Sequence, residues 1–77
     1  MILHGYNLII DGRFMPGVLE ELEGRMPSSF ERTSSRNRVK YDFGSGLIPM
    51  EISRIAECAA ELGIEKFFFQ SIDYEED

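Results

Sequence analysis

Hydrophobic residues recur along this 77-residue chain with two different spacings, and the order of the spacings limits the folds that the chain can form. A period of two residues indicates a strand with one buried face, whereas spacings of three and four residues indicate the apolar face of a helix. The order along the chain is strand, helix, strand, strand, helix, strand. A chain of this length builds one hydrophobic core, so we expect a single domain over residues 1–77.

The first strand and the first helix are predicted at the start of the chain. Residues 2–10 alternate as a strand, and the pair Asp11-Gly12 then either closes a hairpin or forms the loop into a helix. We expect the loop, because helical spacing follows it. The apolar face of the predicted helix consists of Met15, Val18, Leu19, Leu22 and Met26.

Residues 28–46 are predicted to form a β-hairpin with a polar turn at residues 34–37. In its second strand Val39, Tyr41 and Phe43 alternate with charged residues, which predicts one apolar and one charged face. The basic residues of the hairpin are expected either to be simply solvated or to contact an anionic group, a partner's carboxylate more than a nucleic acid. This secondary candidate surface consists of Arg32, Arg36, Arg38 and Lys40.

A second helix is expected between Pro49 and Gly63, and its apolar stripe is the most regular in the chain. The stripe consists of Ile52, Ile55, Ala56, Ala59 and Leu62. Residues 64–74 form the last predicted strand, and residues 74–77 are expected to be a frayed acidic tail. With right-handed crossovers these elements close as an antiparallel four-stranded sheet with both helices on one face, the ferredoxin-like arrangement of the α+β class.

The net charge is −6, and it is distributed unevenly. Residues 1–24 sum to −3, residues 25–50 to +3 and residues 51–77 to −6. An acidic chain repels a phosphate backbone, so direct nucleic-acid binding is disfavoured and a protein partner with a basic surface is expected. The acidic candidate binding surface consists of Glu57, Glu61, Glu65, Asp73, Glu75 and Glu76. The alternative role of these acids is to keep the chain soluble and to protect the last strand against edge pairing.

Three consecutive aromatic residues in the last strand cannot all point into one core, because neighbours on a strand face opposite ways. If both helices cover one face of the sheet, either Phe68 or the pair Phe67 and Phe69 lies on the other face. Phe68 is the candidate for an apolar interface there. Open apolar sheet faces of this kind are typical of dimer or partner interfaces.

Catalysis and cofactors are not predicted. The only histidine, His4, lies among apolar residues with no nucleophile placed near it, so we expect a protein that is not an enzyme. The only cysteine, Cys58, borders the stripe of the second helix and is expected to pack as a small hydrophobic residue. One cysteine and one histidine cannot form a structural zinc site, and the carboxylates lack the spacing of a calcium loop.

The chain has no basic leader before an apolar run and no stretch of 18 apolar residues, so we expect a cytoplasmic protein that does not bind membranes. The expected function is that of an acidic protein-binding module that inhibits or regulates a larger partner, itself basic or nucleic-acid-binding. By analogy of size and charge, phage anti-defence inhibitors such as anti-CRISPR proteins, and immunity proteins, belong to this class. The alternative is a structural or assembly subunit that acts as a homo-oligomer, in its simplest form a homodimer, through the open sheet face.

Overall fold

The computed structural model describes residues 2–12, 16–26, 29–45 and 47–75 of the chain. Its elements, in chain order, are β1 (Ile2–Asp11), α1 (Pro16–Gly24), β2 (Glu31–Ser35), β3 (Arg38–Asp42), α2 (Pro49–Glu61) and β4 (Phe67–Glu75). The predicted order of strands and helices is confirmed. Asp11 ends β1, and the next element along the chain is α1 and not a paired strand, so Asp11-Gly12 does not form a hairpin turn.

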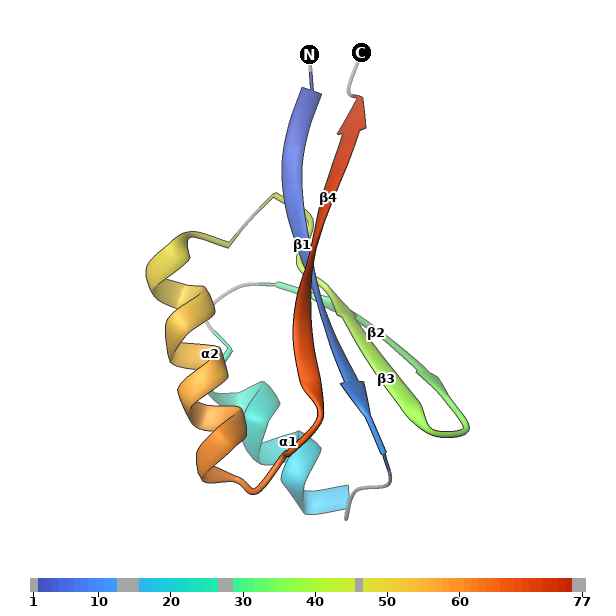
Figure 1. Ribbon diagram of the computed structural model, residues 1–77, viewed down its shortest axis with the longest axis vertical. Coiled ribbons are helices and arrows are strands. Elements are labelled where there is room, and N and C mark those ends of the chain that lie inside the picture. Colours follow the sequence, from blue (N-terminus) through green and yellow to red (C-terminus); the bar gives the residue numbers. More distant parts are fainter. Residues whose placement is uncertain (1, 13–15, 27–28, 46, 76–77) are drawn as a thin grey trace.

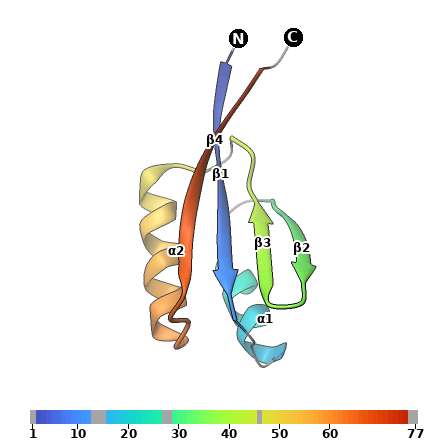
Figure 2. The ribbon, with the colours of Figure 1, turned by 45° about the vertical axis from the view of Figure 1, so that its right-hand side comes forward.

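The four strands form one antiparallel sheet in the order β2-β3-β1-β4. Helix α1 connects β1 to β2 across β3, and helix α2 connects β3 to β4 across β1. The helices lie together on one face of the sheet, and the other face is open (Figures 1 and 2). This is the ferredoxin-like arrangement of the α+β class that the sequence predicts.

The hydrophobic core lies between the sheet and the two helices. Leu8 and Ile10 of β1 are fully buried, as are Tyr41 of β3 and Leu22 of α1, and Ile55 of α2 is 2% exposed. These residues belong to one cluster, which also contains Val39, Phe43, Leu47, Cys58, Ala59 and Ile64. The two-residue period of the strands and the helical spacing of both stripes are therefore confirmed, except at two residues. Met15 lies outside the described residues, and Ala56 is half-buried but does not belong to the cluster.

Both ends of α2 follow from local chemistry. Pro49 opens the helix, where a missing N–H costs no hydrogen bond, and the Glu51 carboxylate accepts a hydrogen bond of 3.3 Å from the Ile48 N–H. At the other end Gly63 has a φ of 82°, a conformation that glycine adopts without strain. The Ile64 N–H then donates to the Ala59 carbonyl at 3.0 Å, which closes the helix.

Two boundaries differ from those predicted. Ser35 pairs with Arg38, so the hairpin turn comprises the two residues 36–37 and not the four residues 34–37. The last strand begins at Phe67, because the residues before it close α2 and bury Ile64 in the core. It continues to Glu75, which pairs with Ile2, so residues 74–75 belong to β4, and residues 76–77 of the expected tail lie outside the described residues.

β1 and β4 are longer than the two hairpin strands. Their outer halves extend beyond both helices as a twisted two-stranded ribbon, and Ile2 pairs with Glu75 near its tip (Figures 1 and 2). The ribbon accounts for the elongated shape of the molecule, which measures 40 × 27 × 18 Å along its principal axes.

Candidate binding surfaces

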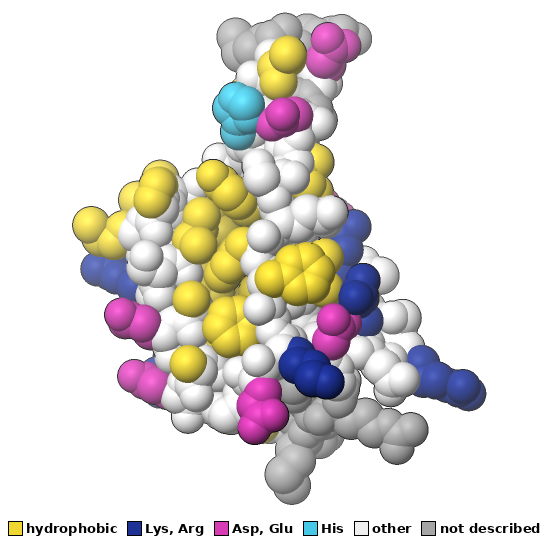
Figure 3. All heavy atoms as spheres, viewed as in Figure 1, with side chains coloured by type: hydrophobic (Ala, Val, Ile, Leu, Met, Phe, Trp, Pro, Cys, Tyr) yellow, Lys and Arg dark blue, Asp and Glu magenta, His cyan; other side chains and the backbone are white. Residues whose placement is uncertain are grey.

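The structure separates the predicted acidic surface into two groups. One group, at the carboxyl-terminal end of α2, consists of Glu57, Glu61 and Glu65, which we call the helical acidic group. The other group, near the end of β4, consists of Asp73 and Glu75. Because α2 and β4 run in opposite directions, the groups lie at opposite ends of the molecule, and Figure 3 shows acidic side chains at both ends. Glu76 lies outside the described residues.

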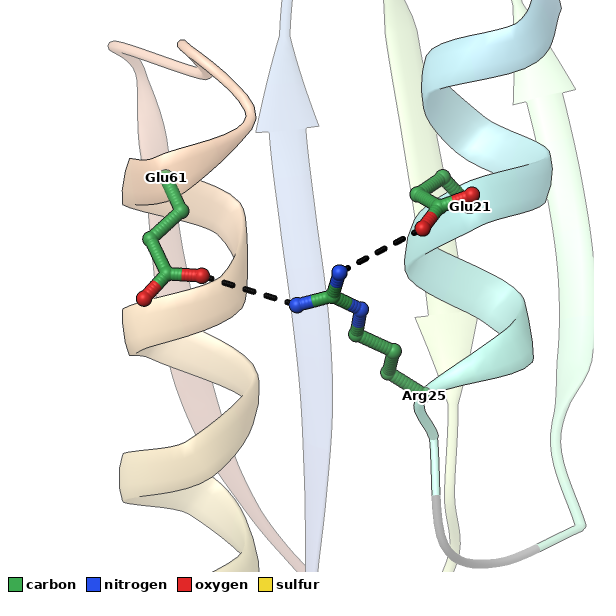
Figure 4. Close-up of polar contacts among 3 residues, drawn as sticks. All are labelled: Glu21, Arg25 and Glu61. Carbon is green, nitrogen blue, oxygen red and sulfur yellow. Dashed lines mark hydrogen bonds and ion pairs between the residues drawn. The ribbon is translucent and has the colours of Figure 1, made fainter.

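Arg25 connects the two helices beside the helical acidic group. Its Nη2 lies 3.3 Å from Oε1 of Glu21 on α1, and its Nη1 lies 3.5 Å from Oε2 of Glu61 on α2 (Figure 4). Nearby Cys58 raises the pKa of Arg25, as do the two carboxylates. Glu61 is thus partly neutralised within the molecule, whereas Glu57 and Glu65 are exposed and form no ion pair with any residue that the structure describes.

A shallow groove of about 270 Å³ lies between the helices at this point. It is lined by Arg25, Arg54, Glu57, Cys58 and Glu61. Charges of both signs meet here, so the groove offers donors as well as acceptors to a partner. The Cys58 side chain is 5% exposed and belongs to the core cluster, as expected of a packing residue.

The basic residues of the hairpin do not form the one surface that the sequence suggests. Arg38 and Lys40 lie on the open face, opposite Asp11 and Ile9, whereas Arg32 is the cross-strand partner of Tyr41, whose side chain faces the helices. Cross-strand partners share a face, so Arg32 lies on the helical side of the sheet. Assigning it to the same patch as Arg38 and Lys40 is therefore wrong.

Arg38 is held by an acid of the neighbouring strand. Its Nε and Nη2 donate hydrogen bonds of 2.6 and 3.2 Å to the two carboxylate oxygens of Asp11. This contact lowers the pKa of Asp11 and raises that of Arg38. Arg36 and Lys40 are exposed and are the bases of this hairpin that form no ion pair within the described residues.

Glu23 of α1 lies outside the apolar face that the spacing predicts for this helix, yet it contacts two strands of the sheet. Its Oε2 accepts hydrogen bonds from Arg32 Nη1 at 2.6 Å and from the Tyr41 hydroxyl at 3.1 Å. The hydroxyl of a buried tyrosine needs such an acceptor. The predicted burial of Tyr41 therefore indicates that some polar group must contact its hydroxyl. The sequence does not reveal which of the acids on α1 supplies it.

Phe68 lies on the open face, where its cross-strand partner is Ile9, while Phe67 and Phe69 pack against the core. The side chain of Phe68 remains 46% exposed. Ile9 beneath it is 6% exposed, because Phe68 and Lys40 lie on either side of it on the neighbouring strands. The apolar surface of the open face is therefore concentrated at the β4 side of the sheet.

His4 lies on the two-stranded ribbon, remote from the core. Its Nδ1 is 2.5 Å from Oδ1 of its cross-strand partner Asp73, and both side chains are largely exposed. Over residues 2–12, 16–26, 29–45 and 47–75, no hydroxyl or thiol is hydrogen-bonded to this imidazole. Within the same residues no three histidine, cysteine, aspartate or glutamate side chains converge as ligands for a metal ion.

Comparison of the chain with protein-family models, with curated proteins and with solved structures gives no match. The structure itself defines a ferredoxin-like α+β domain, a fold that hosts many unrelated functions. Neither α1 nor α2, the helices of the described residues, has the length and apolarity needed to cross a membrane.

Proposed function

We propose that this protein is a non-enzymatic binding module that inhibits or regulates a larger protein by placing its helical acidic group on a basic surface of that partner. The observation that carries this proposal is the pair Glu57 and Glu65. Both are exposed, both lie at one end of α2, and both lack an ion-pair partner among the described residues. Exposed charges in this state are available to a partner at no cost in internal contacts.

The placement of Arg25 supports the same surface. Its two ion pairs, of 3.3 Å to Glu21 and 3.5 Å to Glu61, favour one arrangement of these side chains between the helices in the free protein. Ordering that exists in the free protein lowers the entropy cost of binding. Arg25 and Arg54 also supply donors for carboxylates of the partner, which adds specificity to an otherwise acidic contact.

The distribution of charge gives the module an orientation. The helical acidic group lies on the helical layer, whereas the free bases Arg36 and Lys40 belong to the hairpin. A partner with a positive surface is attracted to one side of the molecule and repelled from the other, which favours productive encounters. If that positive surface is a nucleic-acid-binding groove, occupation by the acids blocks the nucleic acid and inhibits the partner.

Matched baits test this proposal. The wild-type chain, a Glu57→Lys/Glu65→Lys variant and an Arg36→Glu/Lys40→Glu variant are immobilised and exposed to an extract of the cells that encode the protein. We expect a basic protein that is retained by the wild type and by the hairpin variant but not by the acidic variant. The purified protein should then lose bound nucleic acid when the wild-type chain is added. A partner retained equally by all three baits would contradict the proposed surface.

A further inference from the structure

β4 forms an open edge of the sheet. It is nine residues long, whereas β2 at the other edge has five. Residues 67–75 contain no proline and no glycine, and their pairing with β1 runs without a bulge. Short strands, prolines, bulges and charged side chains are the common devices that prevent a sheet edge from pairing with another strand. β4 carries only the last of these, at Asp73 and Glu75 near its end.

One backbone hydrogen bond determines which groups face this open edge. The Asp11 N–H donates to the Lys66 carbonyl at 2.9 Å, so residue 66 directs its backbone toward β1. Successive residues of an antiparallel strand direct their N–H and C=O groups alternately to the two sides. The even-numbered residues of β4 therefore bond to β1. The outward donors and acceptors belong to Phe67, Phe69, Ser71, Asp73 and Glu75.

Apolar side chains line both sides of this backbone. Phe68 and Ile72 lie on the open face, and Phe67 and Phe69 lie on the helical face. Figure 3 looks onto this edge and shows hydrophobic side chains on either side of a white band of backbone and polar side chains. An unpaired ladder flanked by apolar groups is the chemistry that β-strand addition uses.

We propose that β4 pairs in antiparallel fashion with β4 of a second copy of this chain, so that two four-stranded sheets become one continuous sheet. β4 is self-complementary, which favours a second copy of the chain as its partner. With the two-fold axis at Gln70, Phe68 of each copy faces Ile72 of the other, and both pairs lie on the open face. The outward residues Phe69 and Ser71 then face each other and exchange two N–H···O=C bonds per pair.

Neighbouring registers are poorer. An axis at Phe69 places Phe68 opposite the polar Gln70. An axis at Ser71 places both Phe67 and Phe69 opposite acids of the other copy, whereas the axis at Gln70 does so for Phe67 alone, which faces Asp73. Only the register centred on Gln70 pairs the exposed Phe68 with an aliphatic residue. The contact is isologous, so it closes as a dimer and does not propagate into a filament.

The arrangement and the salt dependence of the dimer distinguish it from the proposed complex with a basic partner. Its axis is perpendicular to the sheet, so both pairs of helices lie on the same side and two helical acidic groups are available to one partner. The proposal does not rest on the proposed function, because it uses a different surface. Each copy carries a net charge of −6, so the two copies repel each other and added salt should strengthen the dimer, whereas it should weaken a complex with a basic partner.

Analytical ultracentrifugation over a range of protein concentrations tests whether the dimer forms in the wild type and in two variants of β4. The Ser71 N–H points to the open edge, so Ser71→Pro removes an outward donor and leaves the bonds to β1 in place. This variant should be folded by circular dichroism and monomeric at every concentration, and the wild type should dimerise. Phe68→Lys, at an exposed position, should also be monomeric. A wild type that stays monomeric, or a dimer unchanged in the Phe68→Lys variant, would overturn the proposal.

Disulfide trapping tests the register. In a Cys58→Ala background, Gln70→Cys places two thiols opposite each other at a pair without backbone hydrogen bonds, where strands approach to about 4.5 Å between Cα atoms. Thr33→Cys, on the other edge strand, is the control for random collision. We expect oxidised dimer to form at least about ten-fold faster with Gln70→Cys than with Thr33→Cys. Equal rates in the two variants would exclude this register.

Discussion

The hydroxyl of Tyr41 on β3 donates a hydrogen bond of 3.1 Å to the carboxylate of Glu23 on α1. The same carboxylate accepts a bond from Arg32, so one acid of the first helix holds two neighbouring strands of the hairpin. Tyr41 is fully buried. Burial, together with the negative charge of Glu23, raises the pKa of Tyr41 to about 12.

This shift predicts a loss of stability at alkaline pH. Tyrosine in an unfolded chain ionises near pH 10, while folded Tyr41 keeps its proton until about pH 12. The contribution to stability is therefore complete below pH 10 and is lost as the pH rises from about 10 toward 12. In Tyr41→Phe this part of the decline should be absent. Urea unfolding of both proteins at several pH values between 8 and 12 measures the difference, and parallel curves would show that Tyr41 is not the cause.

The core anchors of the two helices are Leu22 and Ile55. Each is buried in the shared cluster, so truncation to alanine should lower the free energy of unfolding by about 2–5 kcal/mol, a large part of the total for a domain of this size. Met50→Ala is the matched control, because the Met50 side chain is 62% exposed on the same helix as Ile55, and its effect should stay within about 0.5 kcal/mol. Denaturant unfolding decides between these outcomes. Equal stability of all three variants would place the core elsewhere.

The thiol of Cys58 should react slowly with a thiol reagent in the folded protein and rapidly in denaturant. The side chain is 5% exposed at the floor of the groove, so reaction requires local opening of α2. Ser53→Cys in a Cys58→Ala background places an exposed thiol on the same helix and should react faster by about two orders of magnitude. If the two thiols react at similar rates in the native state, Cys58 is not a core residue.

Much of the fold could be predicted from the sequence because its signals are local. The alternation of Val39, Tyr41 and Phe43 and the stripe of α2 each assign a buried face without reference to other elements. The turn at residues 36–37 was less predictable, because its polar neighbours Ser34 and Ser35 fit a loop as well as a strand. The start of β4 depends on the backbone hydrogen bonds that close the end of α2. The spacing of hydrophobic residues does not predict those bonds.

The candidate surfaces were harder to predict, because they depend on contacts between distant segments. Asp73 shares the acidic character of Glu57, but the opposite directions of α2 and β4 place the two at opposite ends of the molecule. Arg32 is separated from Arg38 by register, and register is fixed by the turn. The exposure of Phe68 could be predicted from the sequence, because side chains alternate along a strand and helices cover only one face of this sheet.

A contact between the helical acidic group and a basic partner predicts a specific dependence on salt. Exposed charges at an interface act over about 8 Å at physiological ionic strength and are screened as salt rises. When a partner has been identified, its affinity for three forms of the protein is measured at low and at high salt. The three forms are the wild type, Glu57→Lys/Glu65→Lys and Arg36→Glu/Lys40→Glu. Each variant reverses two exposed charges that form no ion pair within the described residues, so the fold should survive in both. The acidic variant should bind at least about ten-fold more weakly at low salt and should lose most of the salt dependence, while the hairpin variant binds as tightly as the wild type. Loss of affinity in the hairpin variant alone would contradict this account and would place the contact on the hairpin.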